Sequence, residues 1–235
     1  MTDAPDPDLA APWPTPPIPS PTRAGYVMFL HGAGGSPLSW EEQVAKLPPQ
    51  LPARAPWLRG LRPGSADRFA LADAAGEILM TAQLEGVEKV ALVGHSLGAM
   101  VALQCALDRP EAVSHLVLVA GQARPPKAAM TLQRWALKLV PARRLADQGV
   151  SKDKLLEALR DGGQFDAEGS LSQVACPTLV VCGSGGRVNL PASKLFAAQI
   201  PGARLEILDA GHDVMREAPA EFNALLFDFL GHPRP

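Results

Sequence analysis

The chain has 235 residues, of which 47% are hydrophobic and 5% aromatic, and its 22 Lys and Arg nearly balance its 24 Asp and Glu. This length suits one large α/β domain with an insertion, and the balanced charge predicts no nucleic-acid partner. No apolar run approaches the length of a membrane span, and the acidic start lacks the basic and apolar segments of a secretory signal. We therefore expect a cytoplasmic protein without a membrane partner.

The first segment, residues 1–24, is a proline-rich arm. Because proline lacks a backbone N–H and has a fixed φ, such a stretch forms neither a helix nor a central strand. We expect an extended arm lying on the fold. A ligand for a proline-binding partner domain stays open as the alternative.

The folded part is predicted to begin with a buried strand over residues 26–30 and a glycine-rich loop over 31–35. Glycines in such a loop let the backbone approach a ligand closely. A short helix follows and ends before Pro48, residues 53–57 form a weak strand candidate, and 69–84 has a helical pattern. A strand, a loop and helices thus precede the central motif.

The central motif is an apolar strand that runs through a glycine-flanked serine into an apolar helix. Residues 90–93 are typical of a strand buried on both faces, and 99–107 are apolar on nearly every face. Gly94 and Gly98 flank Ser96, as expected for a turn so tight that neighbouring backbone excludes a Cβ. The pattern predicts a nucleophile elbow that exposes the Ser96 hydroxyl above the sheet.

Four more elements follow the elbow helix. Residues 116–119 and 178–181 are short apolar runs that predict buried strands. Residues 204–208 alternate between polar and apolar, as a half-exposed strand near a sheet edge does, and 222–230 are an amphipathic helix. Strands that alternate with helices indicate right-handed βαβ units and a mainly parallel sheet.

A helical cap is predicted over residues 123–172, where helical patterns appear and no strand does. It divides the core into 25–122 and 173–235. The cap contains more basic than acidic residues, among them Arg143 and Arg144. These two could receive an anionic substrate, for example a phosphopantetheine arm, or they could lie on a solvated helix face.

Acyl transfer through a serine requires a base and donors for the tetrahedral oxyanion. His212 is the candidate base because residues 209–213 form a short loop after the last strand, where open α/β sheets place functional groups. Packing or solvent accounts for the other histidines, which are His31, His95, His115 and His232. Core packing likewise accounts for the three cysteines, whose odd number argues against a disulfide framework.

Together these motifs resemble the α/β-hydrolase superfamily, specifically its soluble bacterial branch of small esterases, enol-lactonases and C–C hydrolases. The resemblance runs from about residue 26 to residue 230. It rests on Leu30-His-Gly-Ala-Gly-Gly-Ser with Trp40 downstream, Gly-His-Ser-Leu-Gly at 94–98, Arg109-Pro-Glu-Ala-Val-Ser-His, Pro177-Thr-Leu-Val-Val with Gly183, and Gly211-His212 with Glu217, Pro219 and Phe222.

The resemblance implies an α/β-hydrolase fold in which Ser96 is the nucleophile and His212 the general base. The backbone N–H groups of Ala33 and Leu97 would form the oxyanion hole. Trp40 would lie close to the pocket as a substrate-binding residue, with the cap as its roof. The implied substrate is a small-molecule ester, lactone or thioester, and no organic cofactor or metal is implied.

Two departures from the family pattern affect these expectations. The proline-rich arm stands where the family usually has two antiparallel strands, so we expect a trimmed sheet of about six strands. The acid that orients the histidine normally follows the strand over residues 178–182 in a Gly-x-x-Asp pattern, and here Gly186 stands at the acid position.

Several groups could hold His212 instead, and the sequence leaves the choice open. The candidates are Asp209, Asp213, a cap acid such as Asp147 or Asp166, Ser184, Asn189 and an ordered water. The leading hypothesis is a serine hydrolase that acts through a Ser96 acyl-enzyme. A ligand-binding pseudo-enzyme or a cofactor-independent lyase of the same fold stays open. The sequence determines neither the substrate nor the oligomeric state.

Overall fold

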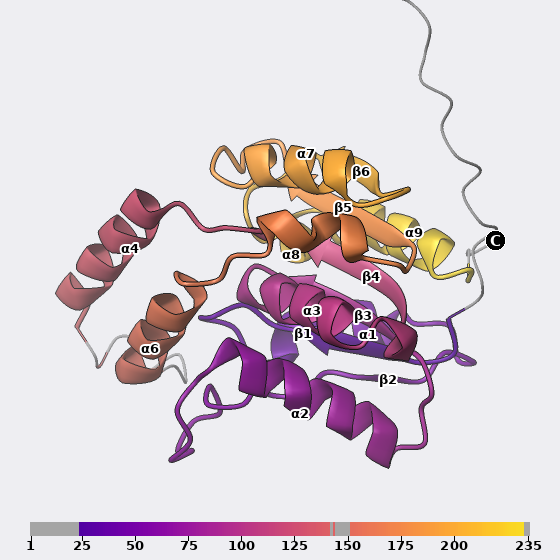
Figure 1. Ribbon diagram of the computed structural model, residues 1–235, viewed down its shortest axis with the longest axis horizontal. Helices are drawn as coiled ribbons and strands as arrows, with labels where there is room; N and C mark the ends of the chain where they lie inside the picture. Colours follow the sequence, from indigo (N-terminus) through magenta and orange to yellow (C-terminus); the bar gives the residue numbers. More distant parts are fainter. Residues whose placement is uncertain (1–23, 142, 144–150, 233–235) are drawn as a thin grey trace, which may run out of the picture.

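A six-stranded sheet forms the centre of the computed structural model, which describes residues 24–141, 143 and 151–232. The strand order is β2-β1-β3-β4-β5-β6, and every neighbouring pair is parallel (Figure 1). The strands are β1 Val27–Leu30, β2 Ala53–Arg54, β3 Val90–His95, β4 Val113–Val119, β5 Thr178–Gly183 and β6 Arg204–Leu208. The mainly parallel, six-stranded sheet expected from the sequence is confirmed. Most of the predicted arm, residues 1–23, lies outside the described residues.

Helices cover both faces of this sheet. The α-helices are α1 Glu41–Ala45, α2 Leu71–Leu84, α3 Leu97–Asp108, α4 Lys127–Leu139, α6 Lys152–Gly162, α7 Leu190–Gln199, α8 Val214–Glu217 and α9 Pro219–Phe229. Short 3-10 helices span Pro37–Trp40, Pro110–Ala112 and Glu168–Gln173. Alternate strand residues divide between two hydrophobic clusters. Leu92 packs in the cluster with α2, α3 and α7, whereas its neighbour Val93 packs in the cluster with α8 and α9. Burial on both faces explains why the strands read as continuous apolar runs.

The order of the strands reverses direction between β1 and β3. The chain leaves β1 for the edge strand β2, returns to β3 on the other side of β1, and then builds β4, β5 and β6 outward. In an open parallel sheet, the loops on either side of such a reversal separate and leave a crevice at the carboxyl ends of the strands. The loops after β1 and β3 contain the glycine-rich segment and Ser96, so this crevice is the place to search for a site.

The cap helices, α4 and α6, follow β4 and precede β5, and they lie together at the carboxyl ends of the strands (Figure 1). Asp161 of α6 attaches the cap to the core, because its Oδ2 accepts a hydrogen bond of 2.7 Å from the backbone N–H of Leu71 at the start of α2. The residue before Leu71 is alanine and provides no side-chain cap. The cap therefore supplies the N-terminal capping group that α2 lacks in its own sequence.

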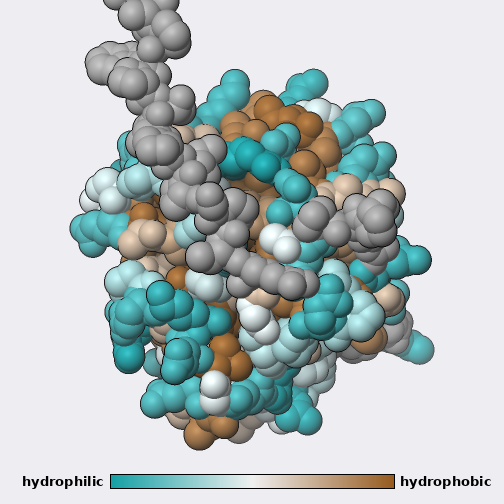
Figure 2. Space-filling view, turned by 90° about the vertical axis from the view of Figure 1, so that its right-hand side faces the viewer, coloured by the Kyte–Doolittle hydropathy of each residue, from teal (hydrophilic) through white to brown (hydrophobic). Residues whose placement is uncertain are grey.

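The end of the molecule opposite the cap helices, shown in Figure 2, presents mainly hydrophilic residues with separate hydrophobic areas between them. Within the described ranges, no helix combines the length and the apolar composition needed to cross a bilayer.

Candidate active site

Ser96 occupies a strained turn between β3 and α3. Its φ of 53° and ψ of −112° lie in a region that residues with a side chain rarely adopt. Its backbone N–H donates a 2.8 Å hydrogen bond to Val119 O at the end of β4, so the neighbouring strand holds the turn in place. This geometry is the one expected for a nucleophile elbow.

The two glycines around Ser96 are required by contact with other backbone. A Cβ at Gly94 would lie 2.3 Å from Gly98 O, and a Cβ at Gly98 would lie 2.1 Å from Leu30 O. Both distances are far below van der Waals contact, and the opposing atoms belong to the backbone, which cannot rotate away. Strand, turn and helix can therefore approach this closely only when both positions are glycine.

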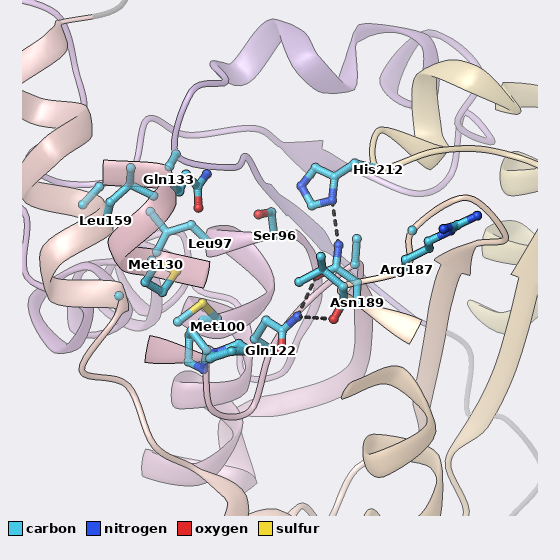
Figure 3. A pocket seen from close by; sticks show the side chains of 18 of the residues that line it. Ser96, Leu97, Met100, Gln122, Met130, Gln133, Leu159, Arg187, Asn189 and His212 are labelled. Atoms are coloured by element: carbon cyan, nitrogen blue, oxygen red, sulfur yellow. Dashed lines mark hydrogen bonds between the residues drawn. The ribbon is translucent and has the colours of Figure 1, made fainter. Parts of the chain in front are cut away.

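Ser96 opens into a cavity of about 640 Å³ beneath the cap. Its wall is mainly apolar: Leu97, Met100, Met130 and Leu159 lie on one side of Ser96 in Figure 3, and His212 and Asn189 lie on the other. A second cavity of about 330 Å³ shares Ser96 and His212 with the first, but extends over the glycine-rich loop towards Asp213 and Arg216. The serine therefore lies where an apolar chamber meets a more polar one.

Two backbone donors expected to bind an oxyanion line this junction. Ala33 follows β1 and lines both cavities, and Leu97 is the first residue of α3 and lines the larger one. In the part of the chain that the structure describes, neither backbone N–H donates a hydrogen bond. Leu97 N–H also belongs to a helix N-terminus, where the helix dipole favours negative charge. Both groups are thus available to a ligand.

His212 lies between β6 and α8 and lines both cavities. Its Nδ1 is 2.8 Å from Nδ2 of Asn189, which precedes α7 and is buried. Asn189 Oδ1 accepts a 2.7 Å hydrogen bond from Gln122 Nε2, which also donates to Val188 O at 3.1 Å (Figure 3). Among the groups that the sequence left open, the structure thus brings Asn189 to His212. Ser96 Oγ and the His212 ring, both described, are not joined by a hydrogen bond.

The other candidates for the orienting group have different contacts. Asp209 accepts a hydrogen bond from Ser184 at 3.1 Å, and Asp166 pairs with Arg124 at 2.7 Å. Asp213 Oδ1 lies 3.5 Å from Nε2 of His95. Asp147 lies outside the described residues, as does Arg144, while Arg143 is exposed. At Gly186, a Cβ would lie 3.1 Å from Gly183 O, so even the first atom of an aspartate side chain would be crowded there.

His95 contacts both the ring and the backbone of His212, a role that the sequence analysis missed. Its ring lies 4.7 Å from the His212 ring, centroid to centroid, and its Nε2 is 3.0 Å from the backbone oxygen of His212. Burial, together with the neighbouring His212, lowers the pKa of His95 to about 4. The ring is therefore neutral at pH 7 and donates one hydrogen bond that fixes the His212 backbone. In sequence, its place inside the elbow motif concealed this contact with a loop more than a hundred residues away.

The expectation that Trp40 lies near the pocket and binds substrate is corrected by the structure. Trp40 is fully buried and lines neither cavity. Its ring packs 5.2 Å from Phe29 and 6.2 Å from Phe222, centroid to centroid, in the cluster beneath α9. The 3-10 helix over Pro37–Trp40 directs the indole under the sheet, a turn of the chain that its sequence position alone does not reveal.

The three cysteines are poor candidates for a reactive group. All three thiols are free and buried, and burial raises the pKa of Cys105 and brings that of Cys176 to about 11. Such thiols stay protonated at neutral pH and are poor nucleophiles. Within the described segments, His, Cys, Asp and Glu form no group of three able to hold a metal ion.

Comparisons with known proteins give one family model, related sequences and similar folds. A family model described as Alpha/beta hydrolase family matches residues 27–225. The chain is 32% identical to a Klebsiella pneumoniae (strain 342) protein named "Putative carbamate hydrolase RutD", in an alignment that covers 96% of this chain and 95% of that protein. The structure is similar to the enol-lactonase from Burkholderia xenovorans LB400 (TM-score 0.80, 18% identity, 89% of this chain and 92% of that chain). It is also similar to a hydrolase from Pseudomonas aeruginosa PA01 (TM-score 0.78, 22% identity, 88% and 90%).

Proposed function

We propose, starting from the fact that the chain belongs to the alpha/beta hydrolase family, that it cleaves a small ester, lactone or thioester through a Ser96 acyl-enzyme. The observation that carries the proposal is the strained turn at Ser96 (φ 53°), which places the serine at the junction of two cavities shared with His212. Backbone strain of this kind persists where the surrounding structure enforces it, typically at functional sites.

In the proposed reaction, Ser96 Oγ attacks the substrate carbonyl carbon while its proton passes to Nε2 of His212. The carbonyl oxygen becomes an oxyanion, which the N–H groups of Ala33 and Leu97 bind. The bond to the leaving group then breaks, and His212 returns the proton to the departing alcohol or thiol. Water repeats these steps on the acyl-enzyme, releases the acid and restores Ser96.

The two chambers support a substrate with unlike ends. The larger cavity has an apolar wall that includes Met100, Met130 and Leu159, and it suits an apolar group. The smaller one, between the glycine-rich loop and Arg216, suits a compact polar group. Because relatives bear the name carbamate hydrolase, and because a carbamate carbonyl can form the same tetrahedral intermediate, we include carbamates among the substrates to test.

The proposal extends to organisation and location. We assign residues 25–122 and 173–235 to the catalytic core and 123–172 to a cap that roofs the larger cavity, a division supported by Met130 and Leu159 in the cavity wall. We place the protein in the cytoplasm.

Labelling with a fluorophosphonate, followed by a panel of activated esters, lactones, thioesters and carbamates, tests the function. We expect one label per chain, on Ser96, and turnover of at least one substrate class. The matched control is Ser184→Ala, which removes a hydroxyl that bonds to Asp209 and lines neither cavity. Absence of label on Ser96 in the folded wild-type protein would refute the serine mechanism and favour a lyase.

A ligand-binding module without turnover is the second candidate. The observation that favours it is the amide nitrogen of Asn189, 2.8 Å from His212 Nδ1, where a triad has a carboxylate. Ligand binding in the larger cavity, measured by calorimetry, without turnover of any of the four substrate classes would support this candidate over the hydrolase.

A further inference from the structure

The polar groups behind His212 form a continuous series of hydrogen bonds. Which atom donates and which accepts along this series follows from the group at its far end. That end is the backbone oxygen of Val188, which can only accept a hydrogen bond. Gln122 therefore presents its amide nitrogen to it, at 3.1 Å, and the second hydrogen on the same nitrogen reaches Asn189 Oδ1, at 2.7 Å. A side-chain amide nitrogen carries two hydrogens, so both bonds form together.

The orientation of the Asn189 amide then determines which ring nitrogen of His212 carries the proton. Since Oδ1 of Asn189 already faces Gln122, its Nδ2 faces His212 Nδ1, at 2.8 Å. An amide nitrogen only donates, so Nδ1 must be without a proton. A neutral imidazole carries its single proton on the other nitrogen, which is Nε2.

This tautomer is the opposite of the one that the proposed reaction uses. A base that takes the Ser96 proton needs a bare Nε2, and the third member of a triad secures it by accepting a hydrogen bond from Nδ1–H. Asn189 can do so only with Oδ1 towards His212, which leaves Nδ2 facing Gln122. Gln122 must then turn its own oxygen inward, and Val188 O loses its donor.

We propose that Gln122 and Asn189 are positioning residues that together set the tautomer of His212. At rest, the chain Val188–Gln122–Asn189 holds the proton on Nε2, and turnover requires both amides to reverse. This inference rests on the proposed serine mechanism for its effect on rate, but the assignment of the ring proton does not depend on it.

Gln122→Glu is the sharpest test because it reverses the chain with almost no change in shape. The carboxylate of this variant can only accept, so it must face Asn189 Nδ2 and turn Oδ1 towards His212. Nitrogen-15 spectra of histidine-labelled protein at about pH 8, above the ordinary imidazole pKa of about 6.5, report which nitrogen carries the proton. We expect Nε2 protonated in the wild type and Nδ1 protonated in Gln122→Glu.

The control for charge is Gln133→Glu, the same substitution in another wall residue of the cavity that contains Ser96 and His212. Gln133 projects from α4 on the far side of Ser96 from Asn189 (Figure 3). A carboxylate there adds charge to the site without reversing the amide chain, so the ring proton should stay on Nε2. His212→Gln identifies the His212 signals by their loss.

Kinetics provides the second readout. We expect kcat of Gln122→Glu to rise roughly fivefold, the factor equivalent to one hydrogen bond. Asn189→Asp, which accepts from both Gln122 and His212, should raise kcat on the order of 10²-fold, towards the roughly 10⁴-fold that the reverse change costs in a serine protease. Combining the two changes should lower kcat below that of Asn189→Asp alone, because two carboxylates would then face each other.

Several outcomes would overturn the inference. One is a wild-type ring with its proton on Nδ1. Another is a ring proton that does not move in Gln122→Glu, and a third is a proton that moves without any rise in kcat. Failure of the hydrolase proposal is distinguishable, since it would show as an unlabelled Ser96 while the spectra of the substrate-free protein still report the tautomer.

Discussion

The two halves of the site, the serine turn and the histidine loop, are built in different ways. Ser96 is held by backbone packed against backbone: Gly98 faces Leu30 O so closely that only hydrogen fits between them. His212 is held by one side-chain hydrogen bond with Asn189 and by one hydrogen bond from His95 to its backbone oxygen. Steric exclusion leaves a single backbone conformation, whereas a side-chain amide can take two orientations, which here differ by the hydrogen bond that Gln122 donates to Val188 O. We therefore expect substitutions of the glycines in the serine turn to destabilise the fold. Substitutions in the hydrogen-bond series behind His212 should instead change the tautomer of this histidine.

The largest expected effect tests the chemistry of the serine turn. Ser96→Ala should reduce turnover by at least roughly 10³-fold, since the residual rate would come from binding and the oxyanion donors alone. The free energy of unfolding should change by less than about 0.5 kcal/mol, because no hydrogen bond of the described structure depends on the hydroxyl. Steady-state kinetics and urea unfolding measure both. Retained turnover would show that another group is the nucleophile.

The next effect tests the steric half of the comparison. Gly98→Ala should destabilise the protein by about 3 kcal/mol or more, because the Cβ would lie 2.1 Å from Leu30 O and the backbone must move. Gly76→Ala in α2 is the matched control: its Cβ meets no atom within 4 Å, and alanine favours a helix, so we expect a gain of about 0.5 to 1 kcal/mol. Equal stability of the two variants in urea unfolding would show that the turn relaxes easily and would remove the contrast.

A smaller effect concerns the histidine loop and pH. Burial lowers the pKa of His95 to about 4, so the unfolded chain binds a proton that the folded chain does not between about pH 6.5 and 4. Stability is thus greatest above pH 6.5 and falls as the pH drops through this window. Between pH 7 and pH 5, this histidine alone should cost roughly 2 kcal/mol. Urea unfolding of wild type and His95→Asn at both pH values measures the difference, and an identical fall in both proteins would contradict the assignment.

The smallest effect sharpens the account of strain. Ser96→Gly should stabilise the protein by about 1 kcal/mol, because glycine adopts a φ of 53° without steric cost. Ser96→Ala retains the Cβ and should show no such gain, so the pair separates strain from loss of the hydroxyl. A glycine variant no more stable than the alanine variant would mean that the turn stores little strain.

The sequence determined by itself the features that depend on local sterics and on periodicity. Continuous apolar runs such as residues 90–93 predicted strands buried on both faces, and alternation over 204–208 predicted the edge strand β6. The spacing of Gly94, Ser96 and Gly98 predicted the tight turn, because so close an approach of backbone leaves few choices of residue. Most of these constraints act between residues close in the chain, so they appear in the sequence as a period or a spacing, and the distant contact of Gly98 with Leu30 O appears there as the glycine itself.

Only the tertiary structure decided which polar groups meet. Trp40 turned away from the pocket into the core, and Asn189 reached His212 from among six kinds of candidate, because loops after different strands converge at the end of the sheet. His95, read as packing, fixes the backbone of His212. Hydrogen bonds between side chains depend on distances of a few tenths of an ångström and on which end of an amide faces its partner. Neither the distance nor the amide orientation produces a periodic pattern or a fixed residue spacing in the sequence, so both are known only from the folded structure.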